Sequence, residues 1–283
     1  MREAARFAGK VCVVTGAAHG MGRAFAVALA REGALLAACD IDAEALGELR
    51  EEPEIAVRET CIETADVADP GARVRFIERV QSALGPVDLL VNNAGVGAGG
   101  PFVEIAGEDW TWLRAINLDA PVDFMRLVIP GMIARGRGHI LNIGSAAGLM
   151  TFPYISTYVA AKHAIVGVSR TLHHELKPKG ISVTVACPGI VRTGILDRGR
   201  TRGIDIEETR KIFRFGIEPD VAVRRMLDAT RRGKEMVIPN HDMKAVYFLY
   251  RLCPVPIDAL VARIAHRTFG RQSPGAPPSL CDR

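Results

Sequence analysis

A tyrosine and a lysine four residues apart, Tyr158 and Lys162, carry the clearest chemical signal in the chain. Their surroundings have the apolar spacing of a helix, on which positions i and i+4 share one face. A phenol with its ordinary pKa of about 10 is a poor base at neutral pH, but a neighbouring ammonium favours the phenolate. Such a tyrosine can take a proton from an alcohol or return one to a carbonyl oxygen. Ser145, thirteen residues earlier, would hydrogen-bond the same substrate oxygen.

A glycine-rich turn near the N-terminus predicts a site for a nucleotide pyrophosphate. A short apolar strand runs straight into Gly16-x-x-x-Gly20-x-Gly22, and a helical pattern follows. Residues without a Cβ let the backbone approach the anion, which the free N–H groups and the positive end of the helix dipole would hold. The next strand ends in Asp40, whose carboxylate would accept hydrogen bonds from the adenosine ribose hydroxyls.

Asp40 also predicts which dinucleotide the site prefers. Its carboxylate would repel the 2′-phosphate of NADP(H), and the sequence places no Arg or Lys nearby to neutralise that phosphate. His19, where a cation could lie, is mostly neutral at pH 7. Asp42 is the better N-cap for the following helix, so Asp40 is not needed for that role. We therefore expect NAD(H) to bind in preference to NADP(H).

The elements that would position these groups alternate between short β-branched strands and amphipathic helices, which is typical of a parallel sheet covered on both faces. In such α/β sheets, ligands bind at the carboxyl ends of the strands. The predicted strands are 11–15, 35–39, 56–64, 87–91, 139–143, 182–186 and 235–238. The predicted helices are 20–32, 43–51, 70–84, 108–135, 156–176 and 218–232.

The chain resembles the classical short-chain dehydrogenases/reductases over roughly residues 8–240, because a set of motifs stands in that family's order and spacing. They are Thr15-Gly16-x-x-x-Gly20-x-Gly22, Asn92-Asn93-Ala94-Gly95, Asn117, Ser145, Tyr158-x-x-x-Lys162 and Pro188-Gly189. The resemblance implies an α/β fold with a Rossmann-type, doubly wound, seven-stranded and mostly parallel sheet. It also implies one catalytic domain over residues 1–240 and an oxidoreductase that moves a hydride between NAD(H) and an alcohol or ketone.

The same resemblance assigns roles to single residues. Tyr158 would be the general acid/base, and Lys162 would bind the nicotinamide ribose and lower the tyrosine pKa. Ser145 would orient the substrate oxygen, and Asn117 would hold a water in a proton relay. The cofactor would lie against Gly16, His19, Gly20, Met21, Gly22, Asp40, Ile41, Asp66, Val67, Asn93, Ala94, Gly95, Tyr158, Lys162, Pro188, Gly189, Ile190 and Thr193.

Apolar residues around the expected substrate pocket favour a lipophilic secondary alcohol or ketone, such as a steroid, a retinoid or another lipid. They are Leu149, Met150, Phe152, Pro153, Tyr154, Ile190, Ile195 and Leu196. Arg192 and Arg198 are the charged side chains that could meet a substrate carboxylate. A sugar or polyol dehydrogenase on the same scaffold is one alternative, which a polar pocket wall would favour. A non-catalytic NAD-sensing binding protein is another, and it would keep its function without Tyr158.

Composition and charge exclude several other classes of protein and of binding site. An apolar fraction of 48% and a net charge of +4 over 283 residues exclude a disordered chain. The six cysteines form no CxxC pair and lie near no histidine at metal-ligand spacing, so we expect no metal site. Free thiols and the lack of an apolar signal stretch at the N-terminus predict a cytoplasmic protein. Nucleic-acid binding is not expected, because the basic residues are not interleaved with aromatic residues on a strand face.

Residues 241–283 form an extension that is both apolar and basic. Residues 196–283 carry 17 basic and 11 acidic side chains, and the segment 243–268 is strongly apolar. It could cover the pocket, complete a subunit interface or make a peripheral membrane contact. The resemblance suggests a homodimer or homotetramer. The last residues, 272–283, are rich in Pro, Ser and Gly and are expected to fray.

Overall fold

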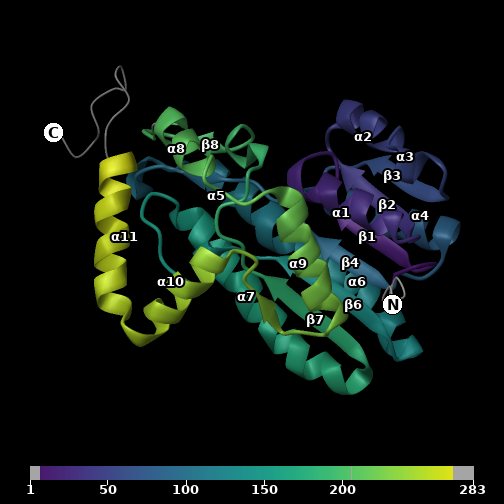
Figure 1. The fold of residues 1–283 in the computed structure, drawn as a ribbon. Coiled ribbons are helices and arrows are strands. Elements are labelled where there is room, and N and C mark those ends of the chain that lie inside the picture. The colour runs from purple at the N-terminus through teal and green to yellow at the C-terminus, as the bar shows by residue number, and fades with distance from the viewer. Residues whose placement is uncertain (1–6, 205, 270–283) are drawn as a thin grey trace.

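A seven-stranded parallel sheet lies at the centre of the molecule (Figure 1). The computed structural model describes residues 7–204 and 206–269. The strand order is β3-β2-β1-β4-β6-β7-β9, and every neighbouring pair is parallel. This order confirms the expected doubly wound, Rossmann-type α/β fold. The strands are β1 (Val11–Thr15), β2 (Leu35–Asp40), β3 (Thr60–Thr64), β4 (Leu89–Asn92), β6 (Gly138–Ile143), β7 (Ile181–Ala186) and β9 (Met236–Val237).

Helices cover both faces of the sheet, because successive side chains of a strand point to opposite sides. In β1, Cys12 and Val14 belong to the core formed with α1 and α9, whereas Val11 and Val13 belong to the core formed with α4, α6 and α7. Burial on both faces explains why the central strands are continuous apolar runs. The covering helices are α1 (Gly20–Arg31), α2 (Ala43–Arg50), α4 (Pro70–Leu84), α6 (Ala120–Arg135), α7 (Ser156–Leu176) and α9 (Pro219–Arg231).

Three buried polar side chains tie α7 to two neighbouring strands. Asn142 of β6 accepts a hydrogen bond from Asn92 of β4 at 2.8 Å and donates one to Ser169 of α7 at 2.9 Å. Buried polar groups are costly unless they are paired, so these bonds favour one position of α7 against the sheet. That position determines which residues of α7 face the carboxyl ends of the strands.

Two predicted elements differ from the structure. The strand expected over 56–64 begins only at Thr60, because Pro53–Ala56 forms the short helix α3, for which Pro53 supplies a suitable first residue. The helix expected over 108–135 is interrupted: α5 (Gly107–Arg114) is followed by a π-helical turn, Ala115–Asp119, and then by α6.

Pro121 explains the interruption. It has no N–H to donate to the carbonyl of Asn117, four residues earlier, so a regular α-helical bond cannot form there. The side chain of Asn117 itself is buried.

Further strands and helices lie outside the predicted ranges, most of them in the C-terminal third of the chain. A short parallel strand pair, β5 and β8, lies outside the main sheet, and α10 and α11 form a hairpin at one end of the molecule (Figure 1). No helix within the described ranges has both the length and the apolar character needed to cross a bilayer. The tail expected at 272–283 lies outside the described residues. The added elements are β5 (Ala98–Gly99), β8 (Arg200–Thr201), α8 (Ile206–Phe213), α10 (His241–Leu252) and α11 (Pro254–Phe269).

Candidate active site

The turn after β1 approaches the end of β4 so closely that two of its positions require glycine. A Cβ on Gly22 would lie 1.8 Å from the carbonyl oxygen of Gly16. A Cβ on Gly16 would lie 2.7 Å from the Cα of Ala94, and the φ of Gly16, +65°, is in the left-handed region. The backbone at the amino end of α1 is therefore unobstructed by side chains of the turn, as anion binding requires.

Thr15 and Asn93 join this turn to β4. The Oγ1 of Thr15 accepts hydrogen bonds from the backbone N–H groups of Asn93 at 3.1 Å and Ala94 at 3.0 Å. The side-chain amide of Asn93 donates to the carbonyls of Thr15 and Gly16, both at 3.0 Å. Thr15 stands in the predicted glycine-rich motif, and the structure makes it the residue that positions the expected cofactor-contacting loop 93–95.

Asp40 lies at the end of β2 beside the glycine-rich turn. Its carboxylate is buried and accepts hydrogen bonds from the N–H groups of Ala18 at 2.9 Å and Asp42 at 3.1 Å. Asp42 caps α2 by accepting from the N–H of Ala45 at 3.1 Å, as predicted. The capping role is thus taken by Asp42, and Asp40 stays oriented toward the turn.

One expectation about this end of the site was wrong. The sequence showed no cation close to Asp40, but the fold brings Arg198 to 3.7 Å from the Asp42 carboxylate, which also bonds His19 at 2.7 Å. Arg198 comes from a distant loop after β7, so spacing along the chain could not reveal it. The hydrogen bond with His19 is the main cause that lowers the pKa of Asp42.

The other residues expected around the adenosine half lie at neighbouring strand ends. The N–H of Ala65 donates to the carbonyl of Asp40 at 2.8 Å, which places Asp66 and Val67 next to the end of β2. Asp66 is exposed and Val67 is buried, while Ile41 is 68% exposed. Met21 is half-buried in the first turn of α1.

Lys162 and Tyr158 lie on α7 at the carboxyl ends of β4 and β6. The Lys162 side chain is buried, and its Nζ donates to the carbonyl oxygen of Ile143, the last residue of β6, at 2.8 Å. The same Nζ lies 5.5 Å from the centre of the Tyr158 ring. A Cβ on Gly95 would lie 3.7 Å from this Nζ, so the β4 loop reaches the lysine as well.

Burial shifts the pKa of both groups. It lowers the pKa of Lys162 to about 8 and raises the pKa of Tyr158 above its ordinary value, and a hydrogen bond with Ser145 opposes the rise for Tyr158. In the protein alone, removal of the phenolate from water therefore outweighs the effect of Ser145 on the tyrosine pKa. That Lys162 lowers this pKa stays a prediction.

Ser145 and Asn117 complete the group that the sequence analysis named. Ser145 follows β6, and its Oγ accepts a hydrogen bond from the N–H of Ala147 at 3.1 Å. Both polar atoms of the Asn117 side chain are engaged by the backbone of Val96: Nδ2 donates to its carbonyl at 2.8 Å, and Oδ1 accepts from its N–H at 2.9 Å. The amide therefore holds the loop after β4 against the π-helical turn.

A buried amide that the sequence analysis missed, Asn240, holds the loop after β7. Its Oδ1 accepts from the N–H of Gly189 at 2.9 Å, and its Nδ2 donates to the carbonyl of Ile190 at 2.9 Å. Asn240 is about fifty residues away in the chain and belongs to no motif, so no sequence signal pointed to it. The carbonyl of Pro188 accepts from the N–H of Ala146 at 2.8 Å, and Thr193 lies against Gly20. The β7 loop thus reaches the glycine-rich turn.

Ion pairs hold the segment that follows the β7 loop, which lies next to the expected substrate pocket. Asp109 of α5 is buried and pairs with Arg200 at 3.0 Å and Arg202 at 3.4 Å. Arg200 also lies over the Trp112 ring, 4.1 Å from its centre. Arg192 forms an ion pair with Glu218. Like Arg198, Arg192 therefore already has an acidic partner.

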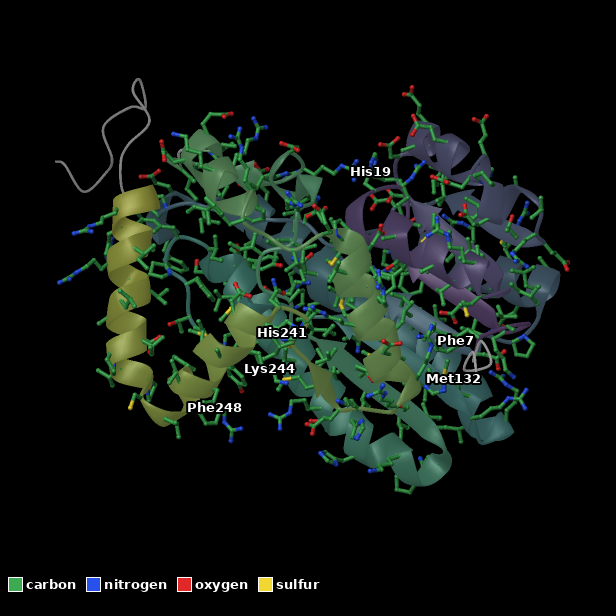
Figure 2. All side chains as sticks on the ribbon, in the orientation of Figure 1. Phe7, His19, Met132, His241, Lys244 and Phe248 are labelled. Atoms are coloured by element: carbon green, nitrogen blue, oxygen red, sulfur yellow. The ribbon has the colours of Figure 1, made fainter. Side chains whose placement is uncertain are left out.

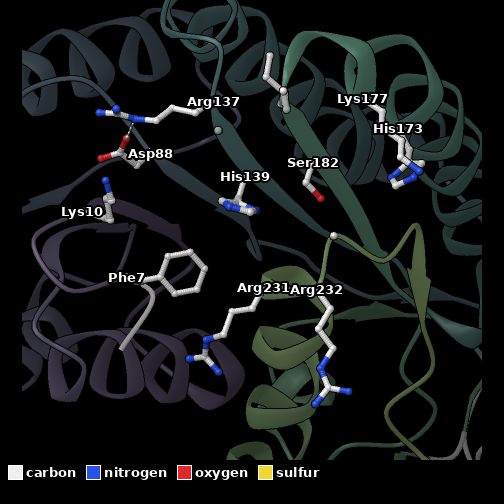
Figure 3. A pocket seen from close by; sticks show the side chains of 14 residues that line it. Phe7, Lys10, Asp88, Arg137, His139, His173, Lys177, Ser182, Arg231 and Arg232 are labelled. Carbon is white, nitrogen blue, oxygen red and sulfur yellow. Dashed lines mark ion pairs between the residues drawn. The ribbon is translucent and has the colours of Figure 1, made fainter. Parts of the chain in front are cut away.

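A cavity of about 650 Å³ lies at the amino ends of the central strands, at the other end of the sheet from Ser145, Tyr158 and Lys162 (Figure 3). Its walls include Phe7, His139, Ser182, Arg231 and Arg232, and none of the predicted site residues contributes to it. Several of its basic residues lie where helices end, a position that the helix dipole favours for cations. Among the described residues there is also no cluster of His, Cys, Asp and Glu that could hold a metal ion.

The buried lysine leads to a prediction for folding stability. The pKa of Lys162 is about 8 in the folded protein against an ordinary value of 10.5. The unfolded chain therefore holds more protons between these values, and the cost of burying the ammonium, present below pH 8, disappears as the pH rises toward 10.5. We expect Lys162→Met to raise the free energy of unfolding at pH 7 by at most about 3 kcal/mol and to lose this advantage with rising pH.

Urea denaturation at several pH values measures this effect, and Lys177→Met, at an exposed lysine, is the control. A variant that is less stable than the parent at pH 7, or an advantage that does not change with pH, would contradict the prediction.

Comparison with known proteins agrees with this geometry. A family model described as short chain dehydrogenase matches residues 10–202. The 3-oxoacyl-(acyl-carrier-protein) reductase FabG of Thermotoga maritima is 32% identical over 218 residues, which cover 77% of this chain and 89% of that protein. Retinol dehydrogenase 10 of Rattus norvegicus is 31% identical over 279 residues, 87% of this chain and 79% of that protein.

A crystal structure of a short-chain dehydrogenase/reductase from Burkholderia phymatum in complex with NAD superposes with a TM-score of 0.81. It is 29% identical in sequence, and the match covers 97% of this chain and 99% of that one. The family model spans more than half of the 283 residues. The chain therefore belongs to the short-chain dehydrogenase family of oxidoreductases.

Proposed function

We propose that this oxidoreductase transfers a hydride between NAD(H) and the CH–OH or C=O group of a lipophilic secondary alcohol or ketone. The observation that carries the proposal is the position of Ser145, Tyr158 and Lys162 at the carboxyl ends of β4 and β6, next to a glycine-rich turn that leaves room for a dinucleotide. The bound nicotinamide would supply or accept the hydride.

Each residue of the group would take a separate part of the proton chemistry. Tyr158 would exchange the hydroxyl proton of the substrate, and Ser145, which already bonds Tyr158, would hold the substrate oxygen. Lys162 would contact the nicotinamide ribose. Because burial raises the pKa of Tyr158, its phenolate would need the positive charge of the oxidised cofactor nearby. The water expected at Asn117 would bond its backbone carbonyl, since Val96 occupies the amide.

Asp40 supports the preference for NAD(H) over NADP(H). Its carboxylate is fixed beside the turn by Ala18 and Asp42, where it would meet the ribose hydroxyls. Arg198 would favour NADP(H) instead, because it brings a positive charge close to Asp42, at the end of β2 where Asp40 lies. The structural relative from Burkholderia phymatum holds NAD, which agrees with the proposed preference.

The lipophilic substrate is supported by the residues before α7 and after β7, which are mainly apolar, and by the fact that Arg192 and Arg198 already have acidic partners. The name of retinol dehydrogenase 10 describes activity on a lipid alcohol in that relative. A sugar or polyol would need polar groups in the same wall. A homodimer or homotetramer in the cytoplasm, in peripheral contact with a membrane, remains the proposed state of the enzyme.

The cofactor preference can be tested by fluorescence titration of the purified protein with NADH and NADPH. We expect NADH to bind more tightly, and Asp40→Ser to reduce the ratio of the two affinities by about tenfold or more, since a charged hydrogen bond to the ribose is lost. Glu44→Gln, at an exposed carboxylate on α2, is the matched control. Tighter binding of NADPH by the parent protein would overturn the role given to Asp40.

The chemical step can be tested with Tyr158→Phe and a panel of secondary alcohols. Loss of the proton-transferring hydroxyl should lower kcat by a factor of about 10² to 10⁴ while NADH binding is unchanged. Turnover is expected to be faster with apolar than with sugar alcohols. Full activity of Tyr158→Phe would refute the mechanism, and binding of NADH without turnover of any alcohol would favour the NAD-sensing alternative.

A further inference from the structure

The hairpin of α10 and α11 presents an unusual outer surface. Among its 12 residues, α10 has none that is buried, although two thirds of its side chains are apolar or aromatic. Figure 2 shows Phe248 at the lower end of the hairpin, close to the turn between the helices. The large apolar side chains exposed on the hairpin are Val246, Phe248, Leu249, Leu252, Val255, Leu260 and Ile264.

These residues form a stripe rather than a scatter. Ala245, Phe248, Leu249 and Leu252 stand at i, i+3, i+4 and i+7 on α10, so they share one face of the helix. The opposite face of α10, which includes Met243, is partly buried; Met243 packs on Gly189. The exposed stripe is therefore the solvent side of a helix whose other side is already attached to the protein.

On α11 the same division holds. Ala265 is buried on the inner side, while Leu260 and Ile264, one turn apart, are each 52% exposed on the outer side.

Basic side chains border the apolar stripe. Lys244 and Arg251 are two turns apart on α10, at the edge of its apolar face, and Arg263 and Arg267 lie next to Ile264 on α11. All four are exposed, and within the described part of the chain none of them forms an ion pair. On this hairpin the described acidic residues are Asp242 and Asp258, and Asp258 accepts a hydrogen bond from Thr151.

We infer that this surface docks on an anionic lipid bilayer. An interfacial helix buries a hydrophobic face at the level of the headgroups and keeps cationic residues at its border, where they meet lipid phosphates. A second copy of the chain fits less well, because a symmetric contact would bring the basic border of one stripe close to that of the other, with only Asp242 and Asp258 as described acidic residues on the hairpin. The apolar stripe would enter the bilayer, and the four cations would contact its charged surface.

The inner side of the hairpin connects this surface to the active site. The Thr151 hydroxyl donates to Asp258 of α11 at 2.9 Å, and the Tyr154 hydroxyl is 2.7 Å from Nδ1 of His266, also on α11. Thr151 and Tyr154 belong to the loop between Ser145 and Tyr158, the expected pocket wall. Docking would therefore place that wall beside the membrane, and a lipid-soluble substrate could enter from the bilayer. This last step rests on the proposed function, whereas docking itself does not.

Flotation of the full-length protein with lipid vesicles tests the docking. We expect binding to vesicles that contain phosphatidylglycerol and phosphatidylcholine, much weaker binding to phosphatidylcholine alone, and release by salt. Phe248→Ser with Leu252→Ser should weaken binding at least about tenfold, since two large apolar side chains no longer enter the lipid. Lys244→Gln with Arg251→Gln should weaken binding to the anionic vesicles and make the remaining binding less sensitive to salt.

Val57→Ser and Arg224→Gln are the matched controls, because both residues are exposed and lie outside the hairpin. Equal losses in the controls, or no binding by the parent protein, would overturn the proposal. The proposal is also overturned if sedimentation shows that Leu252→Ser separates an oligomer while the parent ignores vesicles, because the stripe then covers a second copy. Turnover of a water-soluble secondary alcohol is measured in parallel: vesicle binding without turnover would contradict the proposed function and leave the docking supported.

Discussion

The hydrogen bond between the Lys162 ammonium and the Ile143 carbonyl is the interaction on which the site depends. A buried ammonium is unfavourable, and a carbonyl at the end of a parallel strand is among the few groups that can compensate it without adding charge. The bond joins α7 to β6 and leaves Tyr158 on the same helix face, beside Ser145. The glycine-rich turn and the β4 loop then approach from the other side, because Gly16, Gly22 and Gly95 leave no side chain in the way.

The cofactor half and the substrate half of the site are built differently. The cofactor half is held by hydrogen bonds between neighbouring strand ends, such as those of Thr15 and Asn93. The substrate half depends on contacts made by elements outside the main sheet, including the ion pairs of Asp109 and the bonds from α11 to the loop before α7. Changes in α11 should therefore affect the substrate side more than the nucleotide side.

The sequence predicted well what depends on local spacing. Alternating strands and helices predicted a parallel sheet covered on both faces, and the helical spacing of Tyr158 and Lys162 placed them on one face. The interrupted helix was not predicted, because the effect of Pro121 on the carbonyl of Asn117 depends on hydrogen-bond geometry. Other features were not predicted because their cause lies elsewhere in the chain. Arg198 and Asn240 reach the site only through the fold, and the pKa of Tyr158 depends on burial, which residue types alone do not give.

The central claim is that Tyr158 is a partly buried acid/base whose ionisation depends on the charge of the bound cofactor. Ultraviolet difference titration of the phenolate, with the Tyr158→Phe spectrum subtracted to remove the other tyrosines, measures this ionisation directly. We expect the pKa of Tyr158 to lie above its ordinary value in the protein alone, as burial dictates, and to fall when NAD+ is added. A pKa that is the same with and without NAD+ would contradict the account.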